Sequence, residues 1–121
     1  MAAVTADQIR KRLGLTTADI SDEDALAFRD EAAAFLSEET GETINAEDCS
    51  PSEANAVANL AAVYCYLKVT GSGATGWSVN LGQLTFHGPA EKIAQLEFLK
   101  QQVRDFIHRR KRAGITLLEG P

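Results

Sequence analysis

The chain has 121 residues, a length that fits one domain. Hydrophobic residues make up 45% and charged residues 24%, as in ordinary globular proteins, and no apolar run approaches the roughly 20 residues that span a bilayer. The start, MAAVTADQIRKRLG, lacks the layout of a signal peptide. We therefore expect a chain that is made in the cytosol, is used there or in an assembly built there, and contacts no membrane.

The net charge of −5 is unevenly distributed along the chain. Residues 1–60 carry thirteen Asp/Glu and four Lys/Arg, net −9, whereas residues 61–121 carry four acids and eight bases, net +4. This asymmetry fits head-to-tail self-association, in which the acidic part of one copy meets the basic part of the next. It fits equally well two separate solvated surfaces, because charge statistics constrain partners only weakly.

A short first helix is predicted by its capping residues. Thr5 and Gln8 stand at the spacing of a capping box, in which each side chain satisfies a backbone N–H left free at the helix start. Gly14 is expected to end this helix.

The second helix is predicted from about Asp22 to Thr40. Ser21 precedes it as a cap, three acids occupy its first turn, and Gly41 follows as a left-handed stop. The expected inward face, at helical spacing, is Ala25, Phe28, Ala32, Phe35 and Leu36.

The third helix has the clearest start signal. Ser50 and Glu53 form a capping box, and Pro51 occupies the first helical position, where its missing N–H has no effect. The helix is rich in alanine and should stop at Gly71. Its expected inward residues are Val57, Leu60, Ala61, Tyr64 and Leu67.

The segment GSGATG opens with the G-x-G-x-x-G spacing of a dinucleotide-binding motif, at Gly71, Gly73 and Gly76. That motif has to follow a buried strand and open a helix, whereas here a helix precedes the glycines and no P-loop lysine follows. We therefore interpret 71–76 as a loop. The alternating residues 77–86 predict a small β-hairpin.

The fourth helix begins at Gly88-Pro89, with Glu91 in its first turn. If it reaches Ala113 it is about 37 Å long, which predicts that part of it projects or packs along a neighbour. Its expected apolar face is Ile93, Leu96, Leu99, Val103, Phe106 and Ile107.

One concentrated basic run, Arg109, Arg110, Lys111 and Arg112, lies near the end of this helix. Three interpretations stay open: cations that complement the negative end of the helix, a contact with an acidic protein surface, and a contact with phosphates.

The final segment contains Ile115, Thr116, Leu117 and Leu118, although chain ends are normally polar. It either folds back as a core strand or, the interpretation we favour, adds as a strand to the sheet edge of a partner.

Catalytic signals are weak. His87 and His108 have no adjacent nucleophile or ligand partner, and the acid clusters are explained as helix-end and solvated residues. Cys49 and Cys65 are too few for a four-ligand metal site; we expect reduced thiols, Cys65 in a helix core and Cys49 in a loop. We expect no enzyme, metal or cofactor.

The order of these elements resembles the head–tail connector, or adaptor, proteins of tailed bacteriophages. The resemblance covers roughly residues 5 to 113 and departs from the family in the loop 71–76 and in the basic helix end. The segments that carry it are 5–15, Asp24-Ala25-Leu26, Glu31-Ala32-Ala33, Glu39-Thr40-Gly41, 54–66 and the hairpin SVNLGQLTF over 78–86.

The resemblance implies a ring, usually of twelve copies, in the virion neck between head and tail. The ring docks under the portal protein, extends the DNA channel without sequence-specific binding, and offers a platform for a stopper or tail-completion protein. Residues 115–118 would insert into the portal, and 109–112 would contact a subunit or the portal. An exposed or channel-proximal hairpin would present Val79, Asn80, Leu81, Gly82 and Gln83.

The expected fold class is mainly α, a four-helix bundle-like domain with a small β-hairpin between helices 3 and 4 and a long C-terminal helix. The helical adaptor domain spans 1–113, including the hairpin, and the C-terminal tail spans 114–121. The alternative function is a small DNA-binding accessory protein that uses the basic helix end. A helical regulatory or toxin–antitoxin module with one protein partner is a further possibility.

Overall fold

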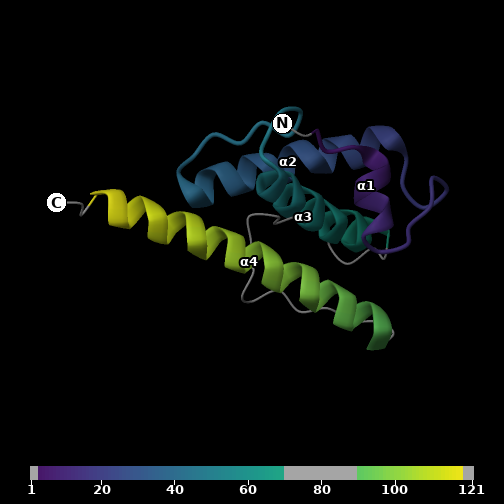
Figure 1. Cartoon of the computed structure of the whole chain (residues 1–121). Helices are drawn as coiled ribbons and strands as arrows, with labels where there is room; N and C mark the ends of the chain where they lie inside the picture. The colour runs from purple at the N-terminus through teal and green to yellow at the C-terminus, as the bar shows by residue number, and fades with distance from the viewer. Residues whose placement is uncertain (1–2, 70–89, 119–121) are drawn as a thin grey trace.

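The computed structural model describes the backbone of residues 3–69 and 90–118, and the side chains of 3–68 and 94–111. The mainly α class is confirmed. No strand occurs in these residues; the predicted hairpin 77–86, with Val79 to Gln83, and the loop 71–76 lie outside them. Four helices are described (Figure 1): α1 (Ala6–Lys11), α2 (Asp22–Thr40), α3 (Pro51–Val69) and α4 (Ala90–Leu118).

The predicted capping box starts α1. The Thr5 Oγ1 accepts a hydrogen bond from the Gln8 backbone N–H at 3.2 Å, and the Gln8 Oε1 accepts one from the Thr5 N–H at 3.4 Å. The helix ends at Lys11, three residues before the predicted stop at Gly14. Gly14 instead supplies a left-handed backbone, with φ of 66°, to the turn that follows.

The predicted bounds of α2 are confirmed. The Ser21 Oγ accepts a hydrogen bond from the Asp24 N–H at 3.2 Å, and Gly41 ends the helix with φ of 73° while its N–H donates to the Ser37 carbonyl. These signals are local, so the sequence alone specifies both ends of the helix.

The centre of the fold is α3, which packs against each of the other three helices. The five predicted inward residues are buried, but so is every residue from Ala56 to Leu67. The expectation of a single inward face was therefore too narrow. A helix that is apolar all round belongs in the interior, and the alanines of α3 allow neighbours to approach it from several sides.

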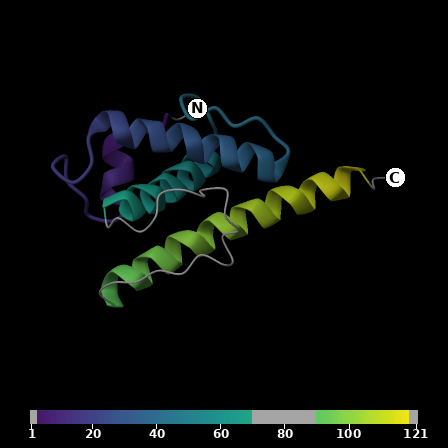
Figure 2. The same ribbon diagram turned by 180° about the vertical axis from the view of Figure 1, so that it is seen from behind.

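The longest helix, α4, runs past the other three, and its C-terminal turns project beyond them (Figures 1 and 2). Its 29 residues are about 43 Å long at 1.5 Å per residue. The predicted apolar face is confirmed for the side chains that are described; Ile93 lies outside them. The buried residues are Leu96, Leu99, Val103, Phe106 and Ile107.

The predicted end of this helix was wrong. The helix does not stop at Ala113 but continues through residues 114–118, so Ile115, Thr116, Leu117 and Leu118 have helical backbone and form neither a core strand nor an added strand. Extending an existing helix by one residue requires no new nucleation, and a single glycine costs only about 1 kcal/mol relative to alanine. Gly114 alone is therefore too weak a signal to end it.

Truncation of one α3 side chain tests its central position. Leu60 is 1% exposed, and we expect Leu60→Ala to lower the free energy of unfolding by about 2–5 kcal/mol, because it leaves a cavity in the core. The matched control is Phe98→Ala at a side chain that is 62% exposed, which should change stability by no more than about 0.5 kcal/mol. Urea unfolding followed by circular dichroism measures both. Equal effects would contradict a core centred on α3.

Candidate functional site

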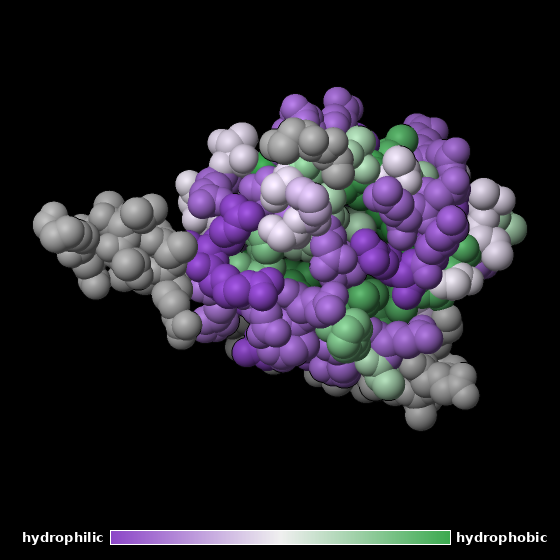
Figure 3. Space-filling model, in the orientation of Figure 1, coloured by the Kyte–Doolittle hydropathy of each residue, from purple (hydrophilic) through white to green (hydrophobic). Residues whose placement is uncertain are grey.

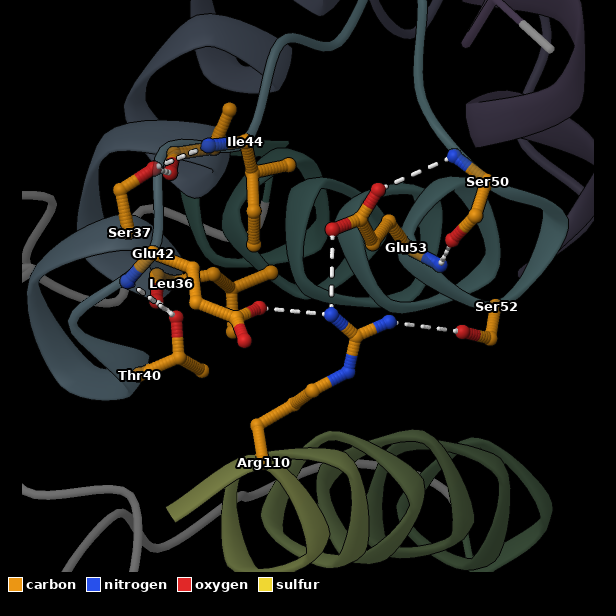
Figure 4. A network of polar contacts seen from close by, with 10 residues as sticks. Leu36, Ser37, Thr40, Glu42, Ile44, Ser50, Ser52, Glu53 and Arg110 are labelled. Atoms are coloured by element: carbon orange, nitrogen blue, oxygen red, sulfur yellow. Dashed lines mark hydrogen bonds and ion pairs between the residues drawn. The ribbon is translucent and has the colours of Figure 1, made fainter. Parts of the chain in front are cut away.

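The predicted basic run meets acidic residues of the same chain. The Arg110 Nη1 lies 2.6 Å from the Glu42 Oε2 and 3.2 Å from the Glu53 Oε2, and its Nη2 donates to the Ser52 Oγ at 3.2 Å. One guanidinium of α4 thus bridges the loop after α2 and the first turn of α3 (Figure 4). Its carbon also lies 4.9 Å from the centre of the Phe106 ring, within the range of a cation–π contact.

Local hydrogen bonds hold the loop that carries Glu42. The Thr40 Oγ1 donates to the Leu36 carbonyl at 2.7 Å and accepts from the Glu42 N–H at 3.3 Å. One turn earlier, the Ser37 Oγ accepts from the Ile44 N–H at 3.0 Å. These bonds fix the chain on both sides of Gly41, so the Glu42 carboxylate is directed toward α4 (Figure 4).

The helix cap of α3 orients the second carboxylate. The Glu53 Oε1 accepts from the Ser50 N–H at 3.0 Å, and the Ser50 Oγ accepts from the Glu53 N–H at 3.2 Å. This is the predicted capping box. The other oxygen, Oε2, is the one that contacts Arg110, so a single side chain both caps α3 and binds α4.

The four cations of the run are not equivalent. Lys111 Nζ lies 3.4 Å from the Glu39 Oε2, so Arg110 and Lys111 are both used within the chain. Arg109 is exposed and forms no ion pair or hydrogen bond in the described part of the chain. The side chain of Arg112 lies outside the described residues. Because the helix continues to Leu118, the run is also too far from its end to complement the helix dipole, which acts over the last turn.

A second ion-pair cluster, not predicted from the sequence, joins α1 to α2. The Arg10 Nη2 lies 2.7 Å from both the Asp7 Oδ1 and the Asp22 Oδ1, and its Nη1 donates to the Ile20 carbonyl at 3.3 Å. Hydrogen bonds to Asp22 and then Asp7 raise the pKa of Arg10, so the buried guanidinium stays charged. The three-residue spacing between Asp7 and Arg10 is one that favours an ion pair on a helix, so this pair could have been predicted from the sequence. The pair with Asp22 could not, because the turn between the helices brings the two residues together.

Both cysteines are buried and neither forms a disulfide; Cys65 lies in α3 and Cys49 in the loop before it. Burial, with a further contribution from Asp24, raises the pKa of Cys65 from 9.0 to about 12. Burial and then Glu53 also raise the pKa of Cys49. A raised pKa suppresses the thiolate, which is the nucleophilic form.

Within the described residues, no three His, Cys, Asp or Glu side chains converge as metal ligands. None of the helices traced there has the length and apolar character that crossing a membrane would need. Comparisons with protein-family models, with curated proteins and with solved structures find no match to this chain.

The contacts of Arg110 predict a salt-sensitive contribution to stability. Arg110→Ala removes partly buried ion pairs and a hydrogen bond, so we expect the free energy of unfolding to fall by about 1–2 kcal/mol at low salt. The adjacent exposed cation gives a matched control, and Arg109→Ala should change it by no more than about 0.5 kcal/mol. Urea unfolding with and without added NaCl measures both, and the difference between the variants should shrink as salt screens the charges. Identical effects would show that the network contributes nothing.

The raised thiol pKa values predict slow labelling of the native chain. At pH 8 a group with a pKa of about 12 is ionised in only about one molecule in ten thousand. We expect a disulfide-exchange reagent to label neither Cys49 nor Cys65 in the native protein while it labels both rapidly in urea. The absorbance of the thiolate released from the reagent measures how many cysteines are labelled. Rapid labelling of a native thiol would contradict its burial.

Proposed function

We propose that this chain is a structural virion protein, a head–tail adaptor whose copies form a ring under the portal protein. The proposal rests on the order and spacing of elements that resemble the phage connector family. The described helices keep that order: a short capped helix, two central helices of 19 residues each and a long last helix. The ring would hold twelve copies, lie in the virion neck, and join the portal to a stopper or tail-completion protein.

The observation that carries most weight is the internal use of the basic run. A ring that lets genomic DNA pass should not grip it, because many free Lys and Arg at phosphates produce tight, salt-dependent binding. Arg110 and Lys111 are instead paired with Glu42, Glu53 and Glu39. This pairing counts against the alternative of a DNA-binding accessory protein, which would need those cations for phosphates.

The end of α4 is the segment we assign to the portal. Its backbone extends as a helix through residues 114–118 beyond the other three helices (Figure 1). We now propose that this segment enters the portal as a helical end rather than as an added strand. Arg109 is exposed on the same helix, and among the described side chains of the basic run it is the cation left for a subunit or portal contact.

Quantitative mass spectrometry of purified particles from the source virus tests this function. We expect a molar ratio to the portal protein near one. A variant that ends after Ala113 retains every buried residue of α4 among the described side chains, so it should fold, yet it should be lost from particles. Absence of the full-length chain from intact particles would contradict the adaptor proposal. Incorporation of the truncated chain at the same ratio would remove the assignment of 114–118 to the portal.

A further inference from the structure

An open groove separates α1 from α4. Both helices pack against α3, but among the described residues they barely touch each other. The space between them has a volume of about 920 Å³ and is bordered by the end of α1, the first half of α3 and the first half of α4. No element of the described chain fills it.

The groove combines apolar and cationic side chains. Phe98, the one large hydrophobic residue of the described chain that is well exposed, lies in its lining at 62% exposure, beside Ala54 and Leu99. The cations Lys11 and Arg12 are exposed there and have no ion-pair partner in the described residues. An apolar surface with unpaired charges of one sign at its edge suits a protein segment of the opposite charge.

A buried polar atom marks the same groove. Asn59 is 1% exposed, and its Nδ2 donates to the Gln102 Oε1 at 2.8 Å. Its Oδ1 has no hydrogen-bond partner among the described residues, although both amides line the groove. An unpaired buried acceptor costs about 1–3 kcal/mol, so a hydrogen-bond donor that reached it would be bound favourably. A carboxylate only accepts, so this atom marks the groove and does not select an acidic occupant.

The outward face of α2 has the complementary chemistry. Exposed residues on this face alternate between acids and alanines at helical spacing, and Glu31 and Glu38 form no ion pair in the described chain. The alanines allow close approach, while the acids can reach the cations at the α1 edge of the groove. We define this acidic face as Glu23, Ala27, Asp30, Glu31, Ala34 and Glu38.

We propose that the groove between α1 and α4 binds the acidic face of α2 from a second copy of this chain. Lys11 and Arg12 of one copy then face Glu31 and Glu38 of the next, and Phe98 packs against Ala34 between them. The inference rests on the proposed function and specifies which surfaces join neighbouring subunits. The two surfaces are different, so the contact is heterologous and repeats in one direction, closing into a ring or continuing as a filament.

Charge exchange between the two surfaces tests the proposal. One variant carries Lys11→Glu and Arg12→Glu; the other carries Glu31→Lys and Glu38→Lys. Sedimentation velocity of the purified chain, from micromolar into millimolar concentrations at low salt, measures assembly. We expect the wild type to self-associate, each variant alone to associate at least about tenfold more weakly, and their equimolar mixture to recover assembly. In the mixture, the unmodified groove of one variant binds the unmodified α2 face of the other and gives dimers. Growth beyond dimers to the wild-type extent requires that the two reversed surfaces also bind each other.

Two controls isolate the contact. Asp48→Lys with Asp105→Lys changes the net charge as much as the α2 variant does, at exposed positions on neither surface, and should assemble like the wild type. Neutral pairs, Lys11→Gln with Arg12→Gln and Glu31→Gln with Glu38→Gln, keep the test valid if a reversed variant unfolds. They should weaken assembly separately, with thermal unfolding unchanged.

The inference and the proposed function fail by different results. A wild type that stays monomeric at every concentration, or folded variants whose mixture does not recover assembly, overturns the α2–groove contact. Neither result bears on whether the chain is found in particles at a ratio near one to the portal, which judges the adaptor proposal alone. The α2–groove contact would also be overturned if the groove formed a stable complex with some other acidic protein or with nucleic acid in place of self-association.

Discussion

The structure depends on the complete burial of α3. Twelve consecutive residues, from Ala56 to Leu67, are shielded from solvent because α1, α2 and α4 cover the helix on different sides. The alanines among them bury little area each, so stability depends on close packing of neighbouring backbones rather than on a few large side chains. The larger buried residues, Leu60, Tyr64 and Leu67, lie between these close contacts. Where two of the covering helices, α1 and α4, barely touch, a groove remains.

Ion pairs between helices then fix how the covering elements sit on α3. Arg10 joins α1 to the start of α2, and Arg110 joins α4 to the loop after α2 and to α3. In both clusters one guanidinium contacts two carboxylates, which a planar group with several N–H donors does well. Glu53 contributes to helix capping and to helix packing at once, so the start of α3 and the position of α4 are coupled through one side chain.

The sequence predicted what is decided locally. The ends of α2 and the caps at Thr5 and Ser50 each follow from residues within about one turn of one another, and the apolar face of α4 follows from the helical repeat of its hydrophobic residues. Each is confirmed where it is described. Hairpin residues 77–86 lie outside the described chain, and that expectation stays a prediction. What failed was the expectation that the last helix ends near Ala113, since α4 continues through Leu118.

Features set by distant residues were beyond the sequence alone. Glu42 and Glu53 stand 68 and 57 residues before Arg110, and no spacing rule links them. The excess of acids in the first half and of bases in the second was visible, and partners in another copy were an open interpretation. The fold shows that part of this complementarity is used within one chain, where the entropy of association does not have to be overcome.

The exposed charges that have no ion-pair partner within the described chain determine which surfaces can bind a neighbouring subunit. Once Arg10, Arg110 and Lys111 are paired inside the chain, the unpaired exposed cations of the described α1 region are Lys11 and Arg12, beside an exposed aromatic ring. The unpaired acids of α2 lie on its outward face, away from α3. A chain that neutralised all of its charges internally would have no directional surface for a neighbour. This chain keeps a cationic surface at α1 and an acidic surface on α2. A repeating, one-directional contact between identical subunits requires two such different surfaces.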